Sequence, residues 1–137
     1  MKKFRNVLVI IETRQMRQPA LERALALAQA SGRDKVRITA VMPVFDFSWD
    51  LTSILSVEQE ESMRESVIKK HQKWLDAYLR INAMGFDITS KVIWSKTIGK
   101  EITATAKEIG ADLIVKTADV HGMLDSVIFT PLDWQLL

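Results

Sequence analysis

The sequence predicts an α/β domain of the Rossmann-like, flavodoxin type, in which helices cover both faces of a parallel sheet. Short runs rich in β-branched residues, such as residues 7–11, are apolar without alternation. Such runs are typical of strands buried on both faces. They alternate along the chain with longer segments in which apolar residues recur at helical spacing. This alternation favours a parallel sheet, because a right-handed crossover places each connecting helix against the sheet.

The first strand is followed by a helix and by a second strand that a proline is expected to end. The helix begins at Pro19, because proline is favoured at the first helical position, and Gly32 is expected to end it. The second strand is expected over residues 35–42, with Pro43 as its end, and residues 44–55 then form a loop. The apolar stripe of the helix consists of Leu21, Ala24, Leu25 and Ala28.

A capping box predicts the start of the longest helix. Ser56 and Gln59 stand at the spacing at which each side chain can bond the backbone N–H of the other residue. The helix is expected to reach about Ala83 and to be ended by Gly85, and residues 88–94 are expected to form a third strand. The residues expected to face the sheet are Met63, Val67, Trp74, Tyr78 and Ile81.

The last part of the chain predicts a helix, a strand and the start of another helix. The helix is expected over residues 99–109 and the strand over residues 113–115. After an apolar run over residues 127–129, Thr130-Pro131 is expected to begin the final helix. A helix this short is marginal alone, so we expect the natural polypeptide to continue beyond Leu137.

Composition bounds the class of protein. The 137 residues suffice for one domain, expected to span residues 1–137, and a net charge of +2 gives no case for nucleic acid. The chain has no cysteine, which excludes disulfides and thiol chemistry. The apolar run at residues 7–11 is shorter than the roughly 7–15 residues of a signal peptide, and no stretch approaches the roughly 20 residues of a membrane span. We therefore expect a cytoplasmic protein without nucleic-acid or membrane partners.

The segment Asp112-Leu113-Ile114-Val115 resembles the strand that precedes the phosphate loop in the universal stress protein family. In that family the strand is followed by two glycines separated by two residues and, about nine residues later, by a Gly-Ser or Gly-Thr pair at the phosphate. Aligning the strand places Thr117 and Val120 at the two glycines. The same alignment places Thr130 and Pro131 at the pair. The spacing is kept, but all four family residues are replaced.

Two further segments resemble one branch of this family, the tandem type E proteins, which carry two such domains in one chain. They are residues 43–48 and residues 127–134. The resemblance spans the whole chain and implies the N-terminal domain of such a protein, within the adenine-nucleotide-binding superfamily. The family sheet is parallel, with the strand order 3-2-1-4-5. We therefore expect the order 3-2-1-4 here, with the fifth strand missing through C-terminal truncation.

The replaced loop residues predict that the domain binds no nucleotide cofactor. Glycines let a phosphate loop adopt positive φ and bring backbone N–H groups close to phosphate. Val120 is β-branched and disfavours positive φ, Pro131 has no N–H, and Asp133 would repel an anion. In place of a phosphate site, residues 130–133 are expected simply to begin a helix capped by Thr130.

A ligand crevice is expected between the first and fourth strands, because open α/β sheets bind ligands at the carboxyl ends of strands where the strand order reverses. Glu12 and Lys116 end these strands, and the family usually has a nucleotide-contacting acidic residue at the position of Glu12. We hypothesise that the two side chains form an ion pair across the crevice. The alternative is that Lys116 reaches solvent. The candidate crevice residues are Glu12, Val41, Lys116, Phe45, Phe47 and Trp49.

Three of these candidates, Phe45, Phe47 and Trp49, crowd one loop. They could cover a small apolar ligand or contact a partner domain, or they could pack under the loop. His71 lies among apolar helix residues and His121 in the replaced loop, a weak metal signal, so we expect no metal. No nucleophile motif of the G-x-S-x-G type occurs, so we expect no enzyme.

These observations favour a non-enzymatic stress-response module that acts through partner domains or a non-nucleotide ligand. The alternative is an ATP-binding or ATP-hydrolysing universal stress protein, and an enzyme of the wider superfamily is a third candidate. The expected partner is a second universal stress protein domain or a second copy. Without a fifth strand, the fourth strand would present an open apolar edge, so we expect a dimer.

Overall fold

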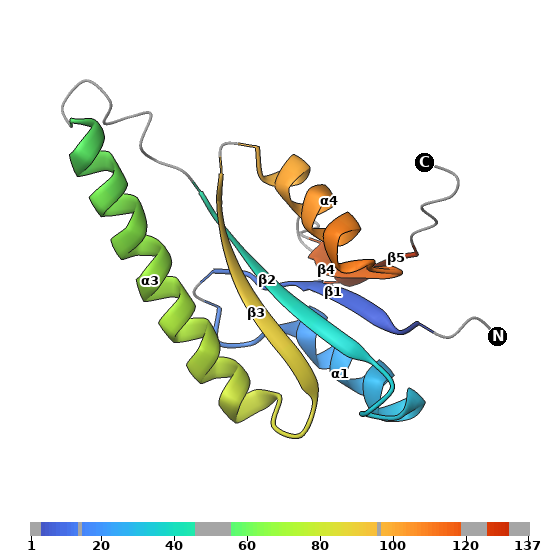
Figure 1. Ribbon diagram of the computed structural model, residues 1–137. Coiled ribbons are helices and arrows are strands. Elements are labelled where there is room, and N and C mark those ends of the chain that lie inside the picture. The colour runs from blue at the N-terminus through green and yellow to red at the C-terminus, as the bar shows by residue number, and fades with distance from the viewer. Residues whose placement is uncertain (1–3, 14, 46–55, 96, 119–125, 132–137) are drawn as a thin grey trace.

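The computed structural model describes residues 4–13, 15–45, 56–95, 97–118 and 126–131 (Figure 1). In these residues strands and helices alternate until the last strand. The strands are β1 (Asn6–Ile10), β2 (Arg37–Phe45), β3 (Asp87–Ser95), β4 (Leu113–Ala118) and β5 (Ser126–Pro131). The helices are α1 (Pro19–Ser31), α3 (Val57–Asn82) and α4 (Ile98–Ile109).

The strands form one sheet with the order β3-β2-β1-β4-β5. β1 to β4 are parallel to one another, and β5 runs antiparallel to β4. The expected order 3-2-1-4 and the α/β fold class are therefore confirmed. α1 and α3 cover one face of the sheet and α4 covers the other (Figure 1).

The central strand β1 is buried on both faces, as its unbroken apolar run indicates. Val7, Val9 and Ile11 belong to the core under α1 and α3. Leu8 points to the opposite face, into the smaller core under α4. Successive side chains of a strand alternate between the two faces, so a strand covered on both sides must be apolar throughout.

Local signals at the helix ends are confirmed. Gln59 N donates to Ser56 Oγ at 3.2 Å, and Ser56 N donates to Gln59 Oε1 at 2.9 Å, which completes the capping box of α3. Pro19 is the first residue of α1. Gly110, at the end of α4, has φ of +67°, a left-handed conformation that glycine adopts without steric cost.

The buried stripe of α3 differs from the expected one. Leu75 and Leu79 are its buried residues, while Trp74 and Tyr78 lie at the edge of the core. Ile81, expected to face the sheet, is 76% exposed. The expected stripe was centred about one residue away from the true one, and one residue rotates a helix by about 100°.

β2 continues past Pro43 to Phe45, so the expectation that proline ends this strand is wrong. Ile11 N donates to the carbonyl of Val41, which shows that Val41 directs its backbone polar groups toward β1. Pro43, two residues on, directs its backbone to the same side, where β1 has already ended at Ile10. The N–H that proline lacks would have had no strand partner there, so it costs no ladder bond.

The largest correction concerns residues 126–131. Thr130 and Pro131 do not begin a helix: they pair with Ile114 and Leu113 in the antiparallel β4–β5 ladder. The run of residues 127–129 is rich in β-branched and aromatic residues, which suit a strand. The parallel fifth strand of the family does not occur among the described residues, and β5 takes the place beside β4. The expected open edge of β4 is therefore also wrong.

Candidate functional site

The reversal of strand order lies between β1 and β4, as the expected topology requires. β1 pairs with β2 on one side and with β4 on the other, with Val9 opposite Val115. The chain leaves β1 toward α1, whereas β4 is reached from α4 on the opposite face. The carboxyl ends of β1 and β4 are therefore neighbours at the place where open α/β sheets bind ligands.

The segment between β1 and α1 is held by one buried amide. Gln18 is 1% exposed, and its Oε1 accepts from the backbone N–H of Glu12 at 3.0 Å. Its Nε2 donates to the carbonyls of Glu12 at 2.8 Å and of Gln15 at 2.9 Å. The side chain thus supplies the turn with hydrogen bonds that a neighbouring strand would otherwise provide, and no polar atom of Gln18 is buried without a partner.

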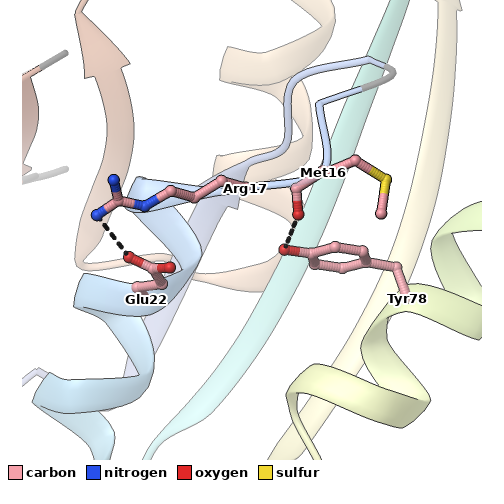
Figure 2. A network of polar contacts seen from close by, with 4 residues as sticks. All are labelled: Met16, Arg17, Glu22 and Tyr78. Carbon is pink, nitrogen blue, oxygen red and sulfur yellow. Dashed lines mark hydrogen bonds and ion pairs between the residues drawn. The ribbon is translucent and has the colours of Figure 1, made fainter.

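Two further contacts fix the same segment from outside. Thr13 Oγ1 donates to the carbonyl of Pro43 at 3.1 Å, which ties the segment to the end of β2. The Tyr78 hydroxyl, on α3, donates to the carbonyl of Met16 at 3.1 Å (Figure 2). Arg17 and Glu22 form an exposed ion pair at 3.5 Å beside it (Figure 2). The segment between β1 and α1 is therefore tied to β2, α1 and α3.

Tyr78 remains a hydrogen-bond donor over the physiological pH range. Burial raises the pKa of its phenol above the ordinary value, and the negative charge of Glu22 raises this pKa further. A hydrogen bond to the backbone of Gln18 acts in the opposite direction and lowers the pKa by less than the other two causes raise it. Its ring stacks on Trp74 with ring centroids 5.0 Å apart. The neutral phenol is thereby favoured and kept in position to bond Met16.

The three described crevice candidates occupy different environments. Glu12 is half-buried, and its backbone is bonded on both sides by Gln18. Val41 has no exposed surface and packs with Leu8 in the core under α4, so it does not line an open surface. Lys116 is exposed on β4. The ion pair between Glu12 and Lys116 stays a prediction.

Of the positions expected to correspond to the family's phosphate loop, the described ones lie at opposite ends of β4. Thr117 lies near the carboxyl end of β4, opposite Val127. Pro131 lies opposite Leu113, at the amino end of β4, because β5 runs back along the strand. Four residues of strand separate the two ends by about 13 Å. Val120 lies outside the described residues.

Several other candidates also lie outside the described part of the chain. They are Phe47, Trp49 and His121, together with the side chain of Phe45, whose backbone ends β2. His71 is half-buried, with Nδ1 2.8 Å from the carbonyl of Val67. Among the described residues no group of three His, Cys, Asp or Glu side chains is placed to hold a metal. The helices of the described part include none long and apolar enough to cross a membrane.

Comparison with known proteins decides the family. The profile of the universal stress protein family matches residues 3–137. The chain belongs to this family. It is 40% identical to universal stress protein E of Photorhabdus laumondii and 39% identical to that of Escherichia coli K12. Each alignment covers 100% of this chain but 43% of the relative, so the chain spans less than half the length of these proteins.

Solved structures of the family share the fold. A universal stress protein from Burkholderia pseudomallei matches with a TM-score of 0.63 and 21% identity, over 85% of this chain and 83% of the other. UspA from Lactobacillus plantarum matches with a TM-score of 0.51 and 19% identity, over 89% of this chain and 83% of the other. At such identities the similarity concerns the backbone arrangement, and function must be argued from the site.

Proposed function

We propose that this universal stress protein domain is a cytoplasmic, non-catalytic module that binds no ATP and acts through a partner domain, a second copy or a small non-nucleotide ligand. The observation that carries the proposal is the path of the chain after β4. Thr130 and Pro131 are expected from the sequence to correspond to the family's Gly-Ser pair, and they lie in a β-ladder beside Ile114 and Leu113.

A phosphate site needs several backbone N–H groups aimed at one point, commonly at the start of a helix. β5 supplies neither the helix start nor the convergence, because its residues run toward the amino end of the sheet. Pro131 also lacks an N–H. Each lost hydrogen bond to a charged phosphate costs roughly 1.5–3 kcal/mol, so the loss of two weakens binding by about a hundredfold or more.

In this proposal the segment between β1 and α1 contributes to the binding of a small non-nucleotide ligand. Hydrogen bonds of Gln18, Thr13 and Tyr78 order this segment and tie it to β2 and α3. An ordered segment costs little conformational entropy on binding, whatever the chemistry of the ligand. The chain has two histidines and no G-x-S-x-G motif, and the His71 ring nitrogen is already engaged by a backbone carbonyl, so the proposal assigns no catalytic role.

Isothermal titration with ATP and magnesium tests the proposal. We expect no binding heat at millimolar nucleotide, and micromolar affinity would favour the alternative, an ATP-binding universal stress protein. The matched variant carries Thr117→Gly, Val120→Gly, Thr130→Gly and Pro131→Ser. Binding by this variant alone would assign the loss to these four residues. Both proteins should also be measured in a chain of the relatives' full length, so that the shorter length of this chain cannot explain a negative result.

The partner-dependent part of the proposal has its own test. Sedimentation velocity across micromolar concentrations should show a dimer, or a complex with a second universal stress protein domain supplied in trans. A monomer throughout, alone and with the second domain, would leave the small-ligand form of the proposal as the one to pursue.

A further inference from the structure

The edge strand β3 is long and has few of the features that usually protect a sheet edge. Among the described residues β2 is its one neighbouring strand, in regular register over all nine residues of β3. It contains no proline and no bulge, and Lys91 is its one lysine. An edge of this kind offers unpaired N–H and C=O groups to another extended chain. The opposite edge strand, β5, is shorter and ends in Pro131.

A groove of about 330 Å³ lies between this edge and α3. Three consecutive residues of β3, Ile88 to Ser90, line it. Consecutive side chains of a strand point to opposite faces, so a groove lined by all three reaches the backbone edge itself. The other wall comes from the last turns of α3 and the residues that follow it: Asp76, Leu79, Arg80, Ala83 and Met84.

The groove carries one carboxylate, Asp76, and one guanidinium, Arg80, which differ in their contacts. Asp76 Oδ1 accepts from Ser90 Oγ at 2.5 Å and from Gln72 Nε2 at 2.9 Å, so this carboxylate is held by its own neighbours. Arg80 is exposed and takes part in none of the hydrogen bonds or ion pairs of the part of the chain that the structure describes. Met84, 75% exposed, adds apolar surface beside it. The guanidinium of Arg80 therefore offers free N–H donors next to an apolar patch, while the formal charges of Arg80 and Asp76 cancel.

We propose that this groove binds an extended peptide segment of a partner protein, which adds a strand to β3 and places an acidic side chain against Arg80. In strand addition the main chain supplies affinity, and pockets for alternate side chains supply specificity. Residues i and i+2 of the added strand point to the same face. The acidic residue and an apolar residue two positions away would thus meet Arg80 and the surface around Met84.

The inference rests on the proposed function only in expecting a protein partner. The groove lies beside β3, two strands away from β1 and the crevice. The outcome of the nucleotide titration therefore has no bearing on it, and failure of one proposal leaves the other standing.

Peptide libraries test the proposal directly. Two capped octapeptide libraries would alternate threonine with randomised apolar residues and differ at one fixed position, aspartate in the first and lysine in the second. Fluorescence anisotropy should detect binding of the aspartate library. Amide hydrogen exchange should show new protection in β3 and none in β5. The same library with N-methylated backbone should bind at least tenfold more weakly, because it cannot donate to the edge of β3.

Charge reversal locates the site. Arg80→Glu should weaken binding of the aspartate library at least tenfold and should allow the lysine library to bind in its place. Arg23→Glu, an exposed change on α1, is the matched control and should leave both libraries unaffected; circular dichroism verifies that each variant is folded. Absence of binding by the aspartate library, equal binding after N-methylation, or equal effects of the two substitutions would overturn the proposal. Self-association abolished by Arg80→Glu would instead assign the groove to a second copy.

Discussion

The carboxyl ends of β1 and β4 are neighbours in the sheet, yet they are built differently. After β1 the backbone of the segment is bonded by the side chains of Gln18 and Tyr78, and the side chain of Thr13 ties the segment to the carbonyl of Pro43. After β4 the chain returns as β5 and bonds to β4 itself. The described segment after β1 thus depends on specific side chains, whereas β5 is held to β4 by backbone pairing.

This difference concerns how the two strand ends satisfy their backbone groups. A hairpin on β4 satisfies the backbone groups of that strand whatever the side chains are, so glycines are not needed there. The segment after β1 has no strand to replace its contacts. We therefore predict that single substitutions in the segment after β1 lower the free energy of unfolding more than single substitutions that affect the contacts of β4.

The largest effect is expected for Gln18→Ala. The change removes three hydrogen bonds from partly buried backbone groups and leaves a small cavity, so the free energy of unfolding should fall by about 2–4 kcal/mol. Gln18→Glu keeps the volume but cannot donate to the two carbonyls, so it should also destabilise. Urea denaturation measures both. Gln29→Ala, an exposed change on α1, should cost about 0.5 kcal/mol or less.

A smaller loss of stability is expected for Asp112→Ala. Asp112 precedes β4, and its side chain links β4 to the start of β1 at the opposite end of the sheet. The carboxylate accepts from the backbone N–H of Arg5 at 2.9 Å and of Asn6 at 3.3 Å. Losing both bonds should cost about 1–2 kcal/mol, because the site is partly solvated. Glu108→Ala, an exposed change on α4, is the control. If Asp112→Ala lowered the free energy of unfolding more than Gln18→Ala does, the expected order of the two effects would be wrong.

The smallest effect is expected for Tyr78→Phe. Removing the hydroxyl loses one exposed hydrogen bond to Met16, so stability at neutral pH should fall by about 0.5–1 kcal/mol. Tyr78 is the single tyrosine of the chain, so phenolate absorbance reports it alone. Its midpoint should lie above 10 in the folded protein and near 10 in denaturant.

The same shift fixes the sign of the pH dependence. The pKa of Tyr78 is higher in the folded protein than in the unfolded chain, so raising the pH deprotonates the unfolded chain first and favours unfolding. The contribution of Tyr78 to the free energy of unfolding is therefore fully present below about pH 10 and is lost as the pH rises through the folded-state pKa. The stability difference between the parent and Tyr78→Phe should therefore narrow above pH 10. A folded midpoint at or below 10 would contradict the described surroundings of Tyr78.

The sequence predicted features that depend on neighbours along the chain. The capping box of Ser56 and Gln59 is local, and so is the preference of Pro19 for a helix start. The alternation of elements predicted a parallel sheet, and the strand order followed from the resemblance to the family. By contrast, Thr130-Pro131 suits both a helix start and a strand end, and only pairing with β4, a tertiary interaction, separates the two.

The candidate site was less predictable, because its decisive residues act through distant partners. Gln18 has no motif: a glutamine before a helix-starting proline is a weak signal, and its importance comes from burial. Tyr78 was expected to face the sheet, and the sequence did not indicate its bond to Met16. Pro43 could be placed within β2 only by knowing that β1 ends at Ile10.

The hairpin formed by β4 and β5 also bears on the order in which the sheet assembles. Pairing Ala118 with Ser126 closes a short loop, whereas joining β4 to β1 brings together residues 106 positions apart, as the contact between Asn6 and Asp112 shows. The longer closure costs roughly 2 kcal/mol more in chain entropy. We therefore expect the hairpin to form early in refolding and to dock onto β1 as a preassembled unit.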